Sequence, residues 1–329
     1  MDPIQRIVER AKQKPRTIVL PEGSDPRTWT AARQLADEAI AVPIVLGSDV
    51  ECEAAMKEAG VSDVSGITMI HPESSPKHEE YAAEFARIRA HKGLTIEQAR
   101  ETMNDVLYYG AMMVRKGDAD GGVTGAAHTT GDVMRSAIQC IGMAPGISIV
   151  SSIFLMVIPD GRVFSFGDCA IVPDPDADQL ASIAIASAST HRALTDTTPV
   201  VGMLSFSTKG SASHPAVDKV VEATKIVQEQ APDLAVDGEL QLDAAIIESV
   251  GSKKAPGSKV AGHANVLIFP DLNSGNIGYK LTQRLANAQA MGPLVQGLKK
   301  PFYDLSRGCS ADDIVKVSAI CSVVASSQE

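Results

Sequence analysis

Short apolar runs alternate with amphipathic stretches in the first part of the chain, and this alternation constrains the fold more than any other feature of the sequence. Apolar runs at 17–20, 42–46 and 67–70 have the length of buried strands, and the stretches 27–39 and 49–59 have helical spacing. Strands that alternate with helices form a parallel sheet, because each crossover helix packs back on a sheet face. We therefore expect an α/β domain here.

This pattern continues through a polar, helical section at 78–116, a short buried run at 121–125 and a helix at 130–141. It changes at Pro145 and Gly146, which separate it from two apolar runs joined by the turn Pro159-Asp160-Gly161-Arg162. Two such runs around a tight turn indicate an antiparallel hairpin. A domain boundary near residue 145 is therefore predicted.

The second part of the chain is again α/β. Its predicted elements are a helix at 177–190, a strand at 199–204, a helix at 214–230, a loop at 251–262, a strand at 265–269 and a helix at 274–290.

A last helix at 310–325 has no strand after it, so we expect it to pack back on the first domain. The predicted fold is two α/β domains with mostly parallel sheets, a cleft between them, and an antiparallel hairpin in the second. The first domain comprises 1–145 and about 295–329, and the second comprises 146–294. Clefts between domains are common binding sites for small ligands.

Charge and cysteine content exclude several classes of protein. The net charge of −10 argues against nucleic acid, which requires a basic face. Five cysteines without CxxC spacing suggest neither a disulfide framework nor a zinc site, and they fit a reducing cytosol. The longest apolar run, 147–158, is shorter than the roughly 20 residues that span a bilayer. We expect a cytoplasmic protein with neither a membrane segment nor a bound metal.

The segment 304–313 brings a hydroxyl, a guanidinium and a carboxylate together, as Ser306, Arg307 and Asp313. This set suits an acyl phosphate. The arginine fork matches phosphate oxygens, the hydroxyl can donate to a developing oxyanion, and the carboxylate can accept a proton. A structural interpretation stays open, because Ser310 followed by Asp313 is a capping-box variant at a helix start.

A second candidate is the segment 269–280, which leaves a strand and enters a helix through small polar residues. Backbone amides at such a helix start can hold a phosphate, although Asn273 or Ser274 can equally serve as a plain N-cap. Arg284 lies further along the same predicted helix, where it reads as a surface charge.

A third candidate is the segment 125–135, again a strand followed by a capped helix. His128 is a possible base there, but a lone histidine at a strand end is more often structural or exposed. Cys169 and Cys309 have no histidine nearby in sequence that would activate them, so we interpret both as packing residues.

Together these segments resemble the phosphate acetyltransferase family, and the resemblance covers essentially the whole chain. Six blocks in the same order make a chance match implausible. They are PEGSDPRTWTAA (21–32), TGAAHTTGDVMR (124–135), FGDCAIVPDPDADQLASIA (166–184), VDGELQLDAAI (236–246), ANVLIFPDLNSGNIGYKLTQRLA (264–286) and DLSRGCSADDIV (304–315).

The resemblance implies that the thiolate of coenzyme A attacks acetyl phosphate directly, with no permanently bound cofactor, no metal and no acyl-enzyme. Coenzyme A is then a co-substrate, and a homodimer forms largely through the second domain. Asp313 is implied as the general base, and Ser306 and Arg307 as the groups that hold and polarise acetyl phosphate. The residues implied in substrate binding are Arg27, Arg89, Thr129, Arg135, Ser274 and Arg284.

Three alternatives remain at this point. A phosphate butyryltransferase or propanoyltransferase would differ only in its acyl pocket. A non-catalytic module that binds acetyl coenzyme A would not need Ser306, Arg307 and Asp313. A hydroxyacid dehydrogenase of similar layout would carry a dinucleotide fingerprint, and GxGxxG is absent from this sequence.

Overall fold

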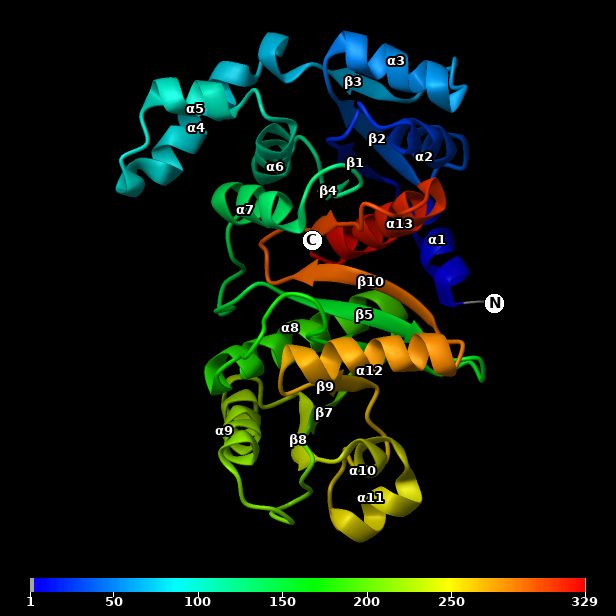
Figure 1. Cartoon of the computed structure of the whole chain (residues 1–329), viewed down its shortest axis with the longest axis vertical. Helices are drawn as coiled ribbons and strands as arrows, with labels where there is room; N and C mark the ends of the chain where they lie inside the picture. The colour runs from blue at the N-terminus through cyan, green and yellow to red at the C-terminus, as the bar shows by residue number, and fades with distance from the viewer. Residues whose placement is uncertain (1–2, 329) are drawn as a thin grey trace. The chain divides into compact units, whose positions relative to one another are not determined.

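The computed structural model describes residues 3–328. The chain folds into two compact units, shown in Figure 1. The first unit comprises Met1–Ala144 and Leu298–Glu329, and the second comprises Pro145–Gly297.

The first unit contains, within the described residues, a five-stranded sheet with the order β11-β4-β1-β2-β3. All of its pairings are parallel, so the carboxyl ends of the strands share one edge. Residues that follow β1, β4 and β11 are thereby placed side by side. The strands are β1 (Arg16–Leu20), β2 (Ala41–Leu46), β3 (Thr68–Ile70), β4 (Gly121–Thr124) and β11 (Phe302–Asp304).

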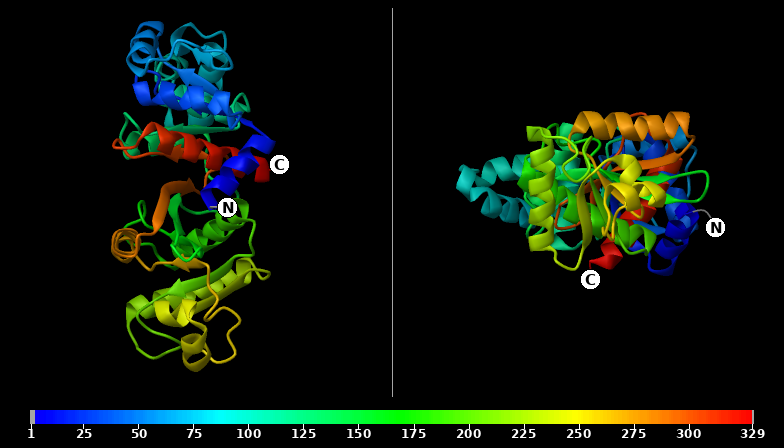
Figure 2. Two further views of the ribbon diagram at one scale, coloured as in Figure 1. Left: turned by 90° about the vertical axis from the view of Figure 1, so that its right-hand side faces the viewer. Right: turned by 90° about the horizontal axis from the view of Figure 1, so that it is seen from below.

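Helices cover this sheet, and the last helix of the chain is one of them. Helix α13 contacts α1, α2, β1 and β4, and α1 and α13 lie side by side in the views of Figures 1 and 2. The expected return of the C-terminal helix to the first sheet is therefore observed. The helices are α1 (Pro3–Gln13), α2 (Pro26–Asp37), α3 (Asp49–Ala59), α4 (His78–Arg89), α5 (Ile96–Thr102), α6 (Val106–Lys116), α7 (Thr130–Cys140) and α13 (Ala311–Ser327), with short 3₁₀ turns η1 (Pro72–Ser74) and η2 (Ala90–Lys92).

The second unit contains a six-stranded sheet with the order β10-β5-β6-β9-β7-β8 in the described part of the chain. Its first two pairings are antiparallel and the other three are parallel. The strands are β5 (Ser151–Val157), β6 (Val163–Gly167), β7 (Val200–Leu204), β8 (Ala235–Leu240), β9 (Val266–Ile268) and β10 (Gln289–Gln296). The helices are α8 (Ala177–Thr195), α9 (Pro215–Gln230), α10 (Leu242–Ile246), α11 (Glu248–Lys254) and α12 (Leu272–Leu285).

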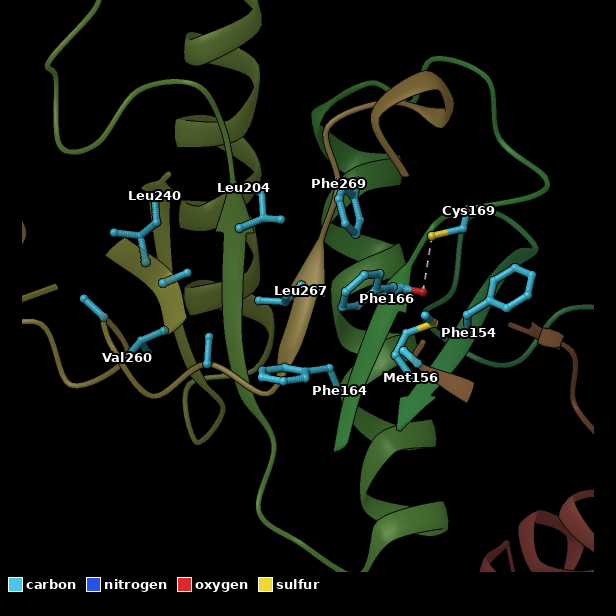
Figure 3. Close-up of a cluster of buried hydrophobic side chains, with 14 of the residues drawn as sticks. Phe154, Met156, Phe164, Phe166, Cys169, Leu204, Leu240, Val260, Leu267 and Phe269 are labelled. Carbon is cyan, nitrogen blue, oxygen red and sulfur yellow. Dashed lines mark hydrogen bonds between the residues drawn. The ribbon is translucent and has the colours of Figure 1, made fainter. Parts of the chain in front are cut away.

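Alternating side chains give the second sheet two apolar faces. Val201 and Met203 pack in one cluster with residues of α8 and α9, whereas Leu204 packs in the other. Figure 3 shows this second cluster, in which the ring centroids of Phe166 and Phe269 lie 5.3 Å apart. The sheet is therefore buried on both sides, as expected for the parallel part of an α/β unit.

Helix α12 is held close to this cluster by an aromatic stack and by glycine. Tyr279 of α12 stacks on Phe154 of β5, with ring centroids 4.0 Å apart. A Cβ built on Gly275 would clash with the carbonyl oxygen of Asp168, and one built on Gly278 would lie 2.9 Å from the ring of Phe269. Only residues without a side chain allow the helix to approach the sheet this closely.

The sequence predicted most elements correctly, including the antiparallel hairpin, which is β5 and β6. Two predictions for the second part were wrong. The predicted helix 274–290 is α12, which ends at Leu285 and is capped by Asp271 rather than by Asn273 or Ser274. The predicted loop 251–262 begins inside α11.

Strands β8, β10 and β11 were not predicted. β10 contains Gly292 and Pro293, residues that are depleted in strands, and its pairing with β5 shifts register between Met291 and Leu294. β11 has only three residues, too few to show a period.

Among residues 3–328, no helix has both the length and the apolar character that crossing a bilayer requires.

We predict that Gly275→Ala destabilises the second unit by about 1–3 kcal/mol, because the added methyl group would force α12 away from the sheet. The free energy of unfolding, measured by urea denaturation with far-ultraviolet circular dichroism, tests this. Gly131→Ala is the matched control, since a Cβ at Gly131 in α7 meets only the hydroxyl of Thr129, at 3.7 Å. Equal stability of the Gly275→Ala variant and the parent would contradict the packing argument.

Candidate functional site

Three loops meet at the carboxyl edge of the first sheet. They are the loop 21–25 after β1, the loop 125–129 after β4 and the loop 305–310 after β11. The first two loops lie close to the third in space although they are far from it in the sequence. The backbone N–H of Leu305 donates to the carbonyl of Thr124 at 2.7 Å, extending the pairing of β4 and β11 into the loops. The predicted site segments around 125–135 and 304–313 are thus brought together by the sheet.

Arg27 ties these loops to one another. Its side chain forms an ion pair with Asp25 at 2.6 Å, and its Nη2 donates to the carbonyl of Ala126 at 2.8 Å. Nη1 donates to the carbonyls of Arg307 and Cys309, each at 2.8 Å. One guanidinium therefore reaches all three loops, and its donors are used within the protein.

Glu22 also binds the loop after β4, through its side-chain carboxylate. Its side chain is only 3% exposed, and it accepts backbone hydrogen bonds from Ala126, Ala127 and His128 at 2.9 to 3.0 Å. It also contacts Nδ1 of His128 at 2.8 Å. Burial favours a higher pKa for Glu22, but these donors outweigh it and leave the pKa below its ordinary value.

Asp304, the last residue of β11, lies beneath the loops. Its Oδ2 accepts from the hydroxyl of Thr130 at 2.6 Å, whereas Oδ1 is buried without a partner among residues 3–328. Burial raises the pKa of Asp304 to about 6, and the charge of Glu22 adds to the shift. Close approach here is possible because Gly125 has φ +101° and no side chain to meet this carboxyl.

Ser306 and Arg307 lie at the exposed tip of the loop after β11. The hydroxyl of Ser306 accepts from the backbone N–H of Gly308 at 3.2 Å. The guanidinium of Arg307 has no hydrogen-bond or ion-pair partner within the described range 3–328. An exposed arginine fork beside a hydroxyl is suited to bind a phosphate group.

Asp313 begins helix α13 as part of a capping box. Its Oδ2 accepts from the backbone N–H and the hydroxyl of Ser310, both at 2.8 Å, and its own N–H donates back to Ser310 at 3.1 Å. The structural interpretation of this pair is therefore correct. Oδ1 of Asp313 has no partner in the part of the chain that the structure describes, so one oxygen of the exposed carboxylate is still able to accept a proton.

Thr129 and Arg135 occupy helix α7, which follows the second loop. Thr129 is the N-cap, accepting from the N–H of Asp132 and donating to its carboxylate at 2.7 Å. Arg135 pairs with Asp132 at 2.8 Å and remains more than half exposed. Both residues lie near the loops, in structural roles that leave Arg135 accessible to an anion.

The remaining predicted residues are Arg89, Ser274 and Arg284. Arg89 ends helix α4 of the first unit without a hydrogen-bond or ion-pair partner among residues 3–328. Ser274 and Arg284 belong to α12 of the second unit, where Ser274 lies in the first turn and donates to the carbonyl of Asp271 at 2.8 Å.

The two cysteines considered as possible nucleophiles, Cys169 and Cys309, are buried. Burial raises the pKa of the Cys169 thiol well above its ordinary value, and it also raises that of Cys309. Both thiols therefore fit the packing interpretation. Across residues 3–328, no cluster of three or more His, Cys, Asp or Glu has an arrangement that could hold a metal ion.

Glu22, Asp25 and Asp304 were not predicted as site residues. The signal available for Glu22 and Asp25 was their position, since they lie two and five residues after the strand run 17–20 and polar residues at the carboxyl ends of parallel strands tend to meet. Asp304 gave no such signal, because β11 itself was not predicted.

Comparisons with known proteins agree over nearly the full length of the chain. Residues 3–322 match the family described as phosphate acetyl/butaryl transferase. The chain is 52% identical to the phosphate acetyltransferase of Thermoanaerobacterium thermosaccharolyticum, over 99% of this chain and 100% of the relative. It is similar to the EutD phosphotransacetylase from Staphylococcus aureus, with a TM-score of 0.92 and 45% identity over 98% of both chains. For a phosphotransacetylase from Streptococcus pyogenes the TM-score is 0.93, with 44% identity over 99% of this chain and 98% of that one.

We predict that Asp304→Asn raises stability at neutral pH. A folded-state pKa of about 6, above the ordinary value of 3.8, means that the parent loses stability as pH rises through this interval, by about 3 kcal/mol in total. Asparagine keeps the shape and carries no charge, so it avoids this loss. Thermal melts of the variant and the parent are compared at about pH 7.5 and about pH 4.5. The Tm of the variant should exceed that of the parent by more at the higher pH. A variant that is no more stable than the parent at about pH 7.5 would refute the assignment.

Proposed function

Because this chain belongs to the phosphate acetyl/butyryl transferase family, we propose that it is a phosphate acetyltransferase. It moves an acetyl group reversibly between acetyl phosphate and the thiol of coenzyme A, which is a co-substrate. The observation that carries this proposal is the 52% identity with a phosphate acetyltransferase along 99% of the chain. The exposed Arg307 and Ser306 support it, since they form a phosphate-binding tip beside an accessible carboxylate.

In the proposed reaction, Arg307 binds the phosphate oxygens of acetyl phosphate and Ser306 donates to the carbonyl oxygen. The sulfur of coenzyme A attacks the carbonyl carbon, forming the thioester bond, while the bond from that carbon to the phosphate oxygen breaks. Negative charge that develops on both oxygens is stabilised by fixed donors, which is the largest contribution in many acyl transfers. Holding both reactants in place lowers the barrier further.

Asp313 is the proposed acceptor of the thiol proton. A thiol ordinarily holds its proton more tightly than a carboxylic acid does, so transfer before attack would be unfavourable. Transfer that accompanies sulfur–carbon bond formation avoids this cost, because the thiol becomes much more acidic as the bond forms. The free Oδ1 of Asp313 is the atom that would receive the proton.

The other substrate contacts remain proposals that follow from the family. Arg27 is 32% exposed, so it can approach a phosphate of coenzyme A while it holds the loops. Arg135 and Arg89 are further accessible cations of the first unit. The set proposed for binding coenzyme A or phosphate is Arg27, Arg89, Thr129, Arg135, Ser274 and Arg284.

A phosphate butyryltransferase is the second candidate, because the family description includes both acyl groups. Its chemistry would be the same, and only the room for the acyl chain would differ. The ratio of kcat/KM values for acetyl, propionyl and butyryl phosphate separates the two candidates.

The direct test is an assay of thioester formation from acetyl phosphate and coenzyme A, followed by ultraviolet absorbance. The purified chain should form acetyl coenzyme A without added metal or nucleotide. Absence of thioester formation by folded protein would refute the proposed function.

We further propose that the chain is a homodimer that uses the outer face of α12. Ile277, Leu281 and Leu285 lie four residues apart on this helix and are 57%, 51% and 78% exposed. An apolar stripe of this kind on a surface helix commonly marks an interface, and the same stripe on a second copy is its natural partner in a twofold dimer.

We predict that Leu281→Glu converts the dimer to a monomer, because two buried carboxylates would face each other across the interface. Light scattering at micromolar concentration measures the mass. Gln228→Glu, which adds the same charge to the exposed face of α9, should leave the dimer intact. A parent protein that is already monomeric would disprove the dimer.

We predict that Asp313→Asn lowers kcat by about 10²- to 10⁴-fold with little change in either KM, since it removes the proton acceptor. Asparagine can still accept from Ser310, so stability should change little. Arg307→Lys should also lower kcat strongly, because lysine keeps the charge and loses the fork. Turnover of a folded Asp313→Asn enzyme within a few-fold of the parent would remove Asp313 from the mechanism.

A further inference from the structure

His128 lies on the loop after β4, with one ring nitrogen bound by the protein and the other left without a partner among residues 3–328. Its Nδ1 is 2.8 Å from the buried carboxylate of Glu22, and its side chain remains 33% exposed. Nε2 has no partner among residues 3–328. One side of the ring is therefore fixed by the protein, and the other side is free to bind a ligand.

Glu22 favours the charged form of this ring. A buried carboxylate with three backbone donors stays ionised, and its negative charge stabilises a proton on the nearby imidazole. The pKa of His128 is raised mainly by the hydrogen bond to Glu22, against the opposing effect of burial, and further by Asp105, the N-cap of α6, and by Asp132 of α7. Each of these groups favours the imidazolium, which has a donor at Nε2.

The loop that carries His128 is tied to the loop that carries Arg307. Nη2 of Arg27 binds the carbonyl of Ala126, two residues before His128, and Nη1 binds the carbonyl of Arg307 itself. The backbone bond between Leu305 and Thr124 links the same two loops. These bonds present the imidazolium and the unpaired guanidinium at the same edge of the sheet.

We propose that the imidazolium of His128, held by Glu22, is a further substrate-binding group of this site and donates from Nε2 to the phosphate group that Arg307 binds. The ligand is acetyl phosphate in one direction of the reaction and inorganic phosphate in the other. This inference rests on the proposed function and adds a residue to it. Asp304 faces Glu22 from β11, and Arg27 faces it from α2, so both influence the charge of the pair.

The proposal has a defined pH dependence. His128 binds phosphate only while it is protonated, so the KM for acetyl phosphate rises as pH increases through the raised pKa of His128. The KM for coenzyme A does not follow the same curve. Loss of one charge-assisted hydrogen bond corresponds to weakening by about ten- to a hundredfold.

The first experiment uses the full chain and inorganic phosphate, with no turnover required. The ring resonances of His128, identified by their loss in His128→Gln, are titrated by nuclear magnetic resonance. Added phosphate should move the pKa of His128 upward, and at any given pH it should leave the chemical shifts of the exposed His91 ring where they were. An unchanged titration of His128 would overturn the proposal. Because this readout needs no catalysis, it is independent of whether the chain transfers acetyl groups.

The second experiment compares His128→Gln with the control His91→Gln in the thioester assay. His128→Gln should raise the KM for acetyl phosphate about tenfold or more and abolish its pH dependence, with kcat and the KM for coenzyme A nearly unchanged. His91→Gln should match the parent. A rise confined to the KM for coenzyme A would overturn the proposal by assigning His128 to a phosphate of that substrate. Glu22→Gln is a less suitable variant, because it loses several loop contacts and can misfold. The role of His128 is therefore tested with the two histidine variants.

Discussion

The parallel pairing of β11 with β4 is the constraint on which the site depends. It places residues from the end of the chain beside a loop almost two hundred positions earlier, with Tyr303 opposite Val123 and Asp304 opposite Thr124. Because both strands run in the same direction, their carboxyl ends open toward the same edge. Ser306 and Arg307 therefore reach the loop that carries His128 without any contribution from their local sequence.

Ion pairs hold charged side chains in place at this edge of the sheet, although the protein as a whole is acidic. The chain carries a net charge of −10, yet Glu22 and Asp25 lie inside the site region and each holds a cation, His128 and Arg27 respectively. Anionic substrates respond to local cations and to backbone amides more than to the total charge. In the proposed site, Glu22 contributes to anion binding indirectly, by holding His128 and favouring its protonated form.

Structural roles coincide with proposed catalytic and binding roles at several positions. Asp313 caps α13 through one oxygen and keeps the other free, and Arg27 joins three loops while a third of its side chain stays exposed. In the second unit, Gly275 and Gly278 seat α12 against the sheet, and this seating leaves Leu281 on the outer face. Because one residue can have both roles, the effects of a substitution on stability and on turnover must be measured separately before a role is assigned.

Periodicity and short motifs are local properties of a sequence. For this reason the sequence by itself determined the alternating elements of both units, the hairpin and the return of the last helix. It also determined the family and the tip formed by Ser306 and Arg307. Tertiary structure alone decided that Glu22 gathers three backbone amides and a histidine, and that Arg27 binds carbonyls up to 282 positions away. It also revealed β10 and β11, one interrupted by glycine and proline and the other only three residues long. Hydrogen bonds between distant backbone groups leave no spacing pattern in a sequence, since any residue except proline supplies the same N–H and every residue supplies the same carbonyl.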